Sequence, residues 1–293
     1  MAFSSYNSIH TNLTTTSSII YTVPPPLISD AFNYNDSLNI LSCYSMRVII
    51  PTYTGPVCNL TRSSDNTSSD FYTDCSQNYF VNTIGMPYVD WFGSSIVYVN
   101  KWYDQSGKNN HAIQDMSLNN RPQISTKDNK YVIYFPNDIS NNYYFIFTNN
   151  IQPKTVFVNM YPIETTYTFS CILQTIVDYG VRLKTSIFPT APMTGGWYAT
   201  SAANGGGTQI AYNNNISTVN VTYNTWNSFA ISIQNPWWTT RYNMITYNDL
   251  AFHRIAFDIN RGRAFNGYIV EMIFHNITMV SDDMTNFYQN RLI

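Results

Sequence analysis

The chain has 293 residues, of which 11% are charged and 16% are aromatic, with a formal net charge of −2. A nucleic-acid-binding protein needs a basic face to displace counterions from phosphates, so this composition argues against one. No run approaches the roughly 20 apolar residues that a membrane-spanning helix requires. Tyrosine-rich surfaces with Asn and Ser suit sugar rings and protein interfaces, so we expect glycans or other proteins as partners.

Residues 1–40 are expected to form a polar N-terminal arm. The first 18 residues lack the basic region and the apolar core of a secretory signal, which favours a protein made in the cytoplasm. Pro24-Pro25-Pro26 favours an extended segment that cannot join the interior of a sheet. An arm that docks on a neighbouring subunit and a disordered tail both remain open.

Residues 41–293 are expected to form one β-sandwich domain. Short runs of alternating apolar residues recur between turn signals, a pattern typical of a sandwich or barrel. These runs are Met46–Ile50, Ser95–Tyr103, Tyr131–Phe135, Tyr143–Thr148, Thr155–Tyr161, Thr166–Ile176, Gly180–Phe188, Thr208–Tyr212, Trp226–Ile233, Arg241–Tyr247, Ala251–Phe257 and Gly267–His275.

A short helix is expected at the end of the chain. Ser281 can act as its N-cap, and Asp282 and Asp283 lie where the helix dipole favours anions. The apolar face that should pack on the sandwich consists of Met284, Phe287, Tyr288 and Leu292.

Several motifs follow one another in a fixed order in the first half of the chain. They are Tyr44-Ser45-Met46-Arg47, Tyr53-Thr54-Gly55-Pro56, Arg62-Ser63-Ser64-Asp65-Asn66, Asp70-Phe71, Trp102-Tyr103-Asp104-Gln105-Ser106-Gly107, Asn110-His111-Ala112 and Asn120-Arg121-Pro122-Gln123-Ile124. This series resembles the amino-terminal half of the α-L-arabinofuranosidase B catalytic domain and the related concanavalin A-like modules of phage and giant-virus particle proteins.

The segment from Phe265 to Phe274, followed by the expected helix, resembles the closing strand and helix of laminin-G-like and concanavalin A-like domains. Residues 125–250 match by strand pattern only. The resemblance implies an all-β, concanavalin A-like jelly-roll sandwich of two antiparallel sheets with a short C-terminal helix.

Similarity to a glycosidase implies a pair of carboxylates, which in a retaining enzyme lie about 5–5.5 Å apart. Asp258 falls where the family carries its acid/base aspartate. The family's nucleophile is a glutamate before a short aromatic strand, and the corresponding stretch, Gly195 to Ala199, has no carboxylate. Asp258 would therefore need an unidentified base and an inverting reaction. We expect that the chain is not an enzyme, with Asp258 as the catalytic residue if it is a glycosidase.

The glycan-binding candidates are two aromatic pairs and one aspartate. They are Trp197, Tyr198, Trp237, Trp238 and Asp104. Adjacent residues of a strand face opposite sides, so at most one member of each pair can contact a glycan and packing is the alternative. Asp104 could instead accept backbone N–H bonds across its turn. Glu271 is expected to point outward or to pair with an arginine.

No cofactor or metal site is expected. Cys43, Cys58, Cys75 and Cys171 lack ligand spacing, so buried free thiols are expected, with a Cys58–Cys75 disulfide or a metal site as the alternative. The four histidines are scattered. Calcium held by Asp-rich loops, as in related sandwiches, remains open.

Two functional interpretations follow. The first is a non-catalytic structural or assembly protein of a virion, such as a minor capsid or decoration protein, in a homo-oligomer or capsid lattice. The second is a carbohydrate-binding, lectin-like module. An arabinofuranosidase-like glycoside hydrolase is a third possibility.

Overall fold

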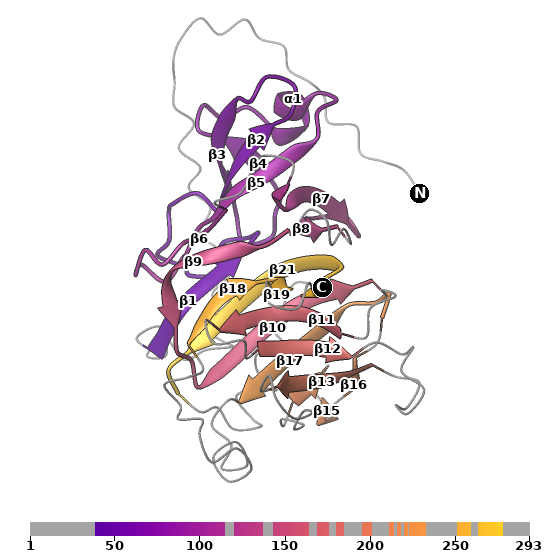
Figure 1. The fold of residues 1–293 in the computed structure, drawn as a ribbon. Coiled ribbons are helices and arrows are strands. Elements are labelled where there is room, and N and C mark those ends of the chain that lie inside the picture. The colour runs from indigo at the N-terminus through magenta and orange to yellow at the C-terminus, as the bar shows by residue number, and fades with distance from the viewer. Residues whose placement is uncertain are drawn as a thin grey trace, which may run out of the picture.

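The computed structural model describes residues 39–114, 120–136, 143–163, 169–175, 180–184, 195–200, 211–213, 216–217, 220–221, 223–232, 251–258 and 263–277. Within these ranges the protein is an all-β sandwich of antiparallel strands with one short helix (Figure 1). The expected all-β sandwich of antiparallel strands is thereby confirmed. The expected arm up to residue 38, the expected strand Arg241–Tyr247 and the expected helix from Ser281 lie outside the described residues.

One layer, called sheet 1 here, is built around the last strand of the chain. Its strands, in order of pairing, are β1 (Ile40–Ser45), β21 (Gly267–His275), β10 (Thr155–Pro162), β17 (Asn227–Ser232), β14 (Ala211–Asn213) and β15 (Ile216–Ser217). The N-terminal strand thus pairs directly with the C-terminal one.

The facing layer, called sheet 2, combines strands from the middle of the chain with one late strand. In order of pairing they are β6 (Ala112–Ile113), β9 (Phe145–Ile151), β18 (Phe252–Ile255), β11 (Phe169–Thr175), β12 (Gly180–Lys184), β13 (Gly195–Thr200) and β16 (Asn220–Val221). A separate two-stranded hairpin, β19 (Phe257–Asp258) and β20 (Arg263–Ala264), follows β18.

A third group of elements lies at one end of the sandwich, where Figure 1 shows most of it in indigo to purple. It comprises β2 (Cys58–Arg62), β3 (Ser68–Thr73), β4 (Phe80–Asn82), α1 (Tyr88–Phe92), β5 (Val97–Trp102), β7 (Gln123–Lys127) and β8 (Lys130–Phe135). Pairing of β8 with β21 and of β5 with β6 connects this group to both sheets. No helix within the described ranges is long and apolar enough to cross a membrane.

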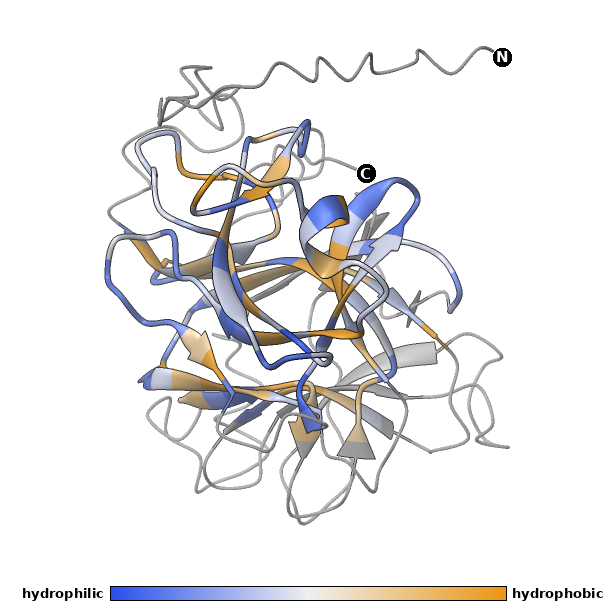
Figure 2. Cartoon of the chain, turned by 90° about the horizontal axis from the view of Figure 1, so that it is seen from above, coloured by the Kyte–Doolittle hydropathy of each residue, from blue (hydrophilic) through white to orange (hydrophobic). Residues whose placement is uncertain are grey.

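Aromatic side chains from both sheets meet in the core between them. The ring of Phe147 in sheet 2 lies 5.6 Å from that of Tyr44 and 5.4 Å from that of Phe274, both in sheet 1. All three side chains are buried. Figure 2 shows the hydrophobic segments along the strands and the polar segments mainly in the connections. Burial of large aromatic surfaces is the main favourable term for such a fold.

Two local expectations differ from the structure. Met46–Ile50 is not a strand, because its backbone bonds lie outside a ladder: Val48 N–H donates to the carbonyl of Asp74, and Ile49 N–H donates to Oε1 of Gln105. The strand is instead β1, just before it. The sequence pattern also missed β2 to β4 and α1, because their polar outer positions obscure the apolar alternation.

Four polar side chains form a row on the face of sheet 1 that points away from the core. Ser45, Glu271, Asn159 and Ser228 occupy paired positions on β1, β21, β10 and β17. The Ser45 hydroxyl donates to Glu271 Oε2 at 3.1 Å, the Asn159 amide donates to Oε1 at 3.4 Å, and the Ser228 hydroxyl donates to Asn159 Oδ1. Arg47 Nε completes the set, 3.1 Å from Glu271 Oε2. All five side chains are buried, and Glu271 takes the arginine-paired role expected for it.

Replacing Arg47 by Met should destabilise the protein strongly, because the Glu271 carboxylate would remain buried without its cation. Removal of one partner from a buried pair costs about 3–5 kcal/mol. Lys127→Met is the matched control, since its 3.8 Å contact with Asp128 lies at the surface, where an ion pair contributes at most about 1 kcal/mol. Urea unfolding measures both, and equal losses would contradict the assigned role of the buried pair.

His275, at the end of β21, should make stability sensitive to acid. Burial, with a smaller effect of Lys108, lowers its pKa to about 3, so the folded protein keeps the ring neutral. The unfolded chain protonates it near pH 6.5, so the stabilisation is complete above that pH and is lost as pH falls toward 3, by up to about 1.4 kcal/mol per unit. We expect the free energy of unfolding to fall more between pH 6.5 and 4.5 in the wild type than in His275→Asn. Parallel pH profiles would show that His275 does not titrate on unfolding.

Candidate functional site

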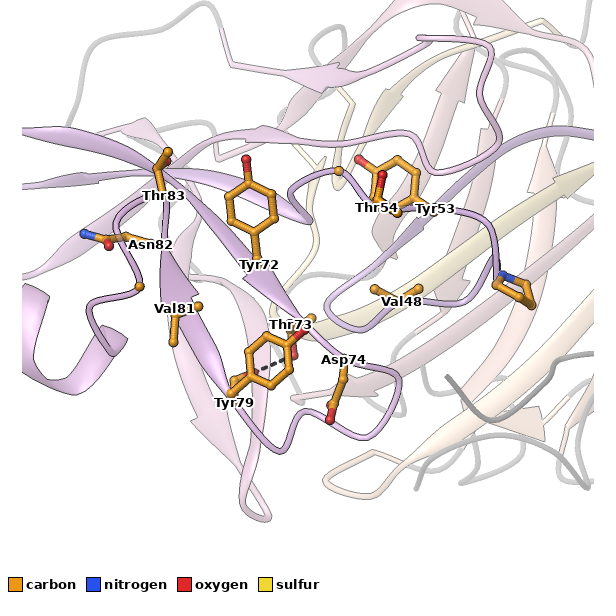
Figure 3. A pocket seen from close by; sticks show the side chains of 13 residues that line it. Val48, Tyr53, Thr54, Tyr72, Thr73, Asp74, Tyr79, Val81, Asn82 and Thr83 are labelled. Atoms are coloured by element: carbon orange, nitrogen blue, oxygen red, sulfur yellow. Dashed lines mark hydrogen bonds between the residues drawn. The ribbon is translucent and has the colours of Figure 1, made fainter. Parts of the chain in front are cut away.

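A pocket of about 340 Å³ opens between β3, β4 with the residues that flank it, and the loop that follows β1. Figure 3 shows Tyr72 and Tyr79 on one side of this pocket and Tyr53 with Thr54 on the other. Its volume lies at the lower end of the range for small-molecule sites. Three tyrosine rings therefore frame a space that suits a compact ligand.

Local bonding fixes the walls of this pocket. The Tyr53 hydroxyl donates to the carbonyl of Pro56 at 2.7 Å, and the Thr73 hydroxyl donates to the carbonyl of Tyr79 at 2.7 Å. A side chain at Gly55 would collide with the Tyr53 ring, since its Cβ would lie 2.6 Å from the hydroxyl oxygen. The loop thus needs glycine there to bring the ring against its own backbone.

The described lining of the pocket is polar and carries one acidic side chain. Its one carboxylate, Asp74, accepts hydrogen bonds from the backbone of Ser76 and from the backbone and side-chain amides of Asn78, at 2.8–3.0 Å. No Lys, Arg or His lines it among the described residues. Burial, followed by the charge of Asp104, raises the pKa of Tyr53, so this phenol stays protonated. Such a lining favours a neutral, hydroxyl-rich ligand over an anion.

A second feature is a sharp change of direction between β18 and β19. Ala256 is fully buried and has φ of 74°, a conformation that costs a non-glycine residue about 1 kcal/mol or more. Its N–H donates to the carbonyl of Ile172, and its carbonyl accepts from Phe265 N–H, both at 2.8 Å. Buried strain of this kind is typical of functional sites, and this one directs the hairpin that carries Asp258.

The strand registers place the end of β18, which leads through the Ala256 turn to Asp258, at the same end of sheet 2 as the start of β13. Ile255 is paired with Leu173, Leu173 with Val181, and Val181 with Ala199. Three antiparallel pairings separate β18 from β13, so these two strands run in opposite directions. The end of β18 after Ile255 therefore lies at the same edge of the sheet as Trp197 and Tyr198, which precede Ala199. Three strand spacings, about 14 Å, separate β18 from β13. For Asp258, Trp197 and Tyr198 the structure describes the backbone only, and Trp237 and Trp238 lie outside the described residues.

The carboxylate oxygens of Asp104 accept hydrogen bonds from groups of the surrounding turn and of β1. This residue is buried, and Oδ1 accepts from the N–H groups of Cys43 and Ser106 at 2.9 and 3.0 Å. Its Oδ2 accepts from the Ser106 hydroxyl at 2.8 Å and from Asn110 N–H at 3.0 Å. This geometry is the turn role that the sequence left open beside glycan contact.

Within the described part of the chain, the cysteines and the other acidic residues form no metal-binding cluster. All four cysteines are free and buried, and burial raises the pKa of the Cys43 and Cys58 thiols well above normal. Among the described residues no group of three His, Cys, Asp or Glu side chains could hold a metal ion. The sequence did not reveal the pocket tyrosines, because Tyr53, Tyr72 and Tyr79 lie apart in sequence and only the fold brings them together.

No protein-family model matches the chain, and no curated protein matches it either. Three solved structures share its fold with TM-scores of 0.54–0.55 and 12% sequence identity. One is an arabinofuranosidase complexed with arabinofuranosyl-α-1,2-xylobiose. The others are GH54 α-L-arabinofuranosidases, a Glu-to-Gln mutant soaked with 4-nitrophenyl α-L-arabinofuranoside and a protein soaked with a cyclic sulfate inhibitor. The matches cover 88% of this chain and 63% of each of those chains.

These comparisons contradict the expectation of a non-catalytic virion protein. The three structures are glycoside hydrolases, and none is a capsid or decoration protein. The expectation that the chain is not an enzyme was wrong for the same reason. The low charge of the chain does not determine which chemistry its fold carries.

Asp104→Asn should destabilise the protein and should not act through ligand binding. The new amide would oppose N–H donors that now share a carboxylate, and loss of such charge-assisted bonds costs about 2–4 kcal/mol. Asp90→Asn, on the exposed side of α1, should change stability by less than about 0.5 kcal/mol. Thermal and urea unfolding compare the two. If Asp104→Asn is as stable as the control, the buried turn does not depend on its charge.

Proposed function

We propose that this protein is a glycoside hydrolase that acts on α-L-arabinofuranosyl groups, with Asp258 as the proton donor. The observation that carries the proposal is the fold shared with three arabinofuranosidases over 88% of the chain. Because that likeness establishes only the fold and spans 63% of those chains, the activity is supported by two further features. They are the strained turn at Ala256 and the position of the end of β18, just before that turn, at the same sheet end as the start of β13.

The reaction needs one acid and one base. Asp258 would protonate the glycosidic oxygen as the bond from the anomeric carbon to that oxygen breaks. A water molecule would supply the new oxygen on the anomeric carbon and give a proton to a base. The stretch Gly195 to Ala199 carries no carboxylate. A direct displacement by water, with inversion at the anomeric carbon, therefore fits these residues better than a covalent intermediate.

The test is hydrolysis of 4-nitrophenyl α-L-arabinofuranoside and of arabinoxylan by the full chain. Asp258→Asn should lower kcat for arabinoxylan at least about 100-fold while the protein stays folded, because general acid catalysis contributes about 10²–10⁴. The nitrophenyl substrate, whose leaving group needs little protonation, should be affected much less. Proton NMR of the first product should show an inverted anomer.

Asp65→Asn is the matched control, since Asp65 lies on the exposed β2–β3 turn, far in sequence from the hairpin. Equal activity of the Asp258 and Asp65 variants would remove Asp258 from the mechanism. No turnover by the wild type on either substrate would overturn the proposed activity.

A further inference from the structure

Four partly exposed aromatic side chains form a continuous row on the outer face of sheet 1 and the adjoining β8. Tyr134 on β8 is paired with Tyr268 on β21, and Tyr268 is paired with Tyr161 on β10. Trp226, one residue before β17, extends the row. Ring centroids of successive members lie 5.0, 5.9 and 5.6 Å apart. One ring per strand gives a spacing close to the advance per sugar in an extended β-linked chain.

The row differs from ordinary core packing in its exposure and bonding. Neighbouring residues on the same strands, such as Ile133, Ile269 and Met160, are buried, whereas each member of the row keeps part of its surface exposed. The hydroxyls of its three tyrosines make no hydrogen bond with other residues in the described ranges. They are therefore available to the hydroxyls of a ligand.

The β7–β8 hairpin holds one end of the row in place. Asp128 and Asn129 have φ of 51° and 62°, as a two-residue hairpin turn requires. Asp128 Oδ2 accepts a hydrogen bond from Trp226 Nε1 at 2.7 Å, and Lys127 Nζ lies 4.4 Å from the centre of the Tyr161 ring. Lys127 and Asp128 at this end carry opposite charges, which offset each other, so the row favours a neutral partner.

We propose that this aromatic row binds the linear main chain of a neutral polysaccharide by stacking on successive sugar rings. The row is formed by Tyr134, Tyr268, Tyr161 and Trp226. Successive ring planes are inclined by 33°, 65° and 77°. A flat crystalline surface would need coplanar rings, so the row fits a single twisted chain in solution. The proposal deepens the proposed function, because it names a backbone that could carry arabinofuranosyl groups.

The experiment measures binding and does not depend on turnover. Binding is measured for the full wild-type chain and for Asp258→Asn. The probes are soluble arabinoxylan in affinity electrophoresis and a xylo-oligosaccharide in calorimetry. Both proteins should bind, and Tyr161→Ala should weaken binding roughly tenfold through loss of one stacking surface. Tyr103→Ala is the matched control, since Tyr103 is also a partly exposed tyrosine but lies directly after β5, outside both the row and the pocket.

If Tyr161→Ala shows no thermal unfolding transition, and so does not fold, Tyr134→Ala at the other end of the row gives a second test. Retained binding in both folded row variants, or equal loss in Tyr103→Ala, would overturn the proposal. So would binding only to an acidic polysaccharide such as polygalacturonate. Self-association of the wild type that the row variants abolish, without polysaccharide binding, would identify the row as a protein interface instead. If the protein binds the polysaccharide but does not hydrolyse arabinofuranosides, the proposed reaction is wrong and the proposed binding by the aromatic row is retained.

Discussion

The buried carboxylate of Glu271 constrains the whole of sheet 1. An ionised group can stay buried only if it is paired and hydrogen-bonded, and here one partner comes from each neighbouring strand and a third from Arg47. A slip of one residue would turn a partner to the other face and leave the charge uncompensated. The ion pair therefore selects one register for β1, β21 and β10, even where hydrophobic contacts alone would tolerate another.

The outer face of sheet 1 inherits its arrangement from that register. On β10, Asn159 and Tyr161 lie two residues apart and share a face, so the polar row fixes where the aromatic row must lie. On β21 the pairing shifts between the partners of Asn159 and Met160, which places Val270 in a bulge. The bulge keeps Glu271 and Tyr268 on the same face although three residues separate them. A buried structural network and an exposed aromatic row thus depend on the same strand pairing.

The sequence predicted the sandwich because its buried strands alternate clearly, as in Thr155–Tyr161 and Gly267–His275, which match β10 and β21 within one residue. It failed where tertiary bonds replaced the ladder, as at Val48 and Ile49. The role of Glu271 could be expected in part, because a lone glutamate in a closing strand needs a partner. The aromatic row could not be found, since Tyr134, Tyr161 and Tyr268 are far apart in sequence and only strand pairing aligns them.

The two regions assigned to carbohydrate chemistry differ in how the fold supports them. The aromatic row lies on paired strands, where hydrogen bonds on both sides of β21 and β10 hold each backbone in place. Asp258 instead follows a left-handed alanine that is held by Ile172 and Phe265. A glycine at position 256 would adopt that φ without strain but would also loosen the hairpin before folding. Alanine therefore suits the position that directs the proposed proton donor, because the surrounding core imposes the turn and the methyl group limits the alternative backbone conformations.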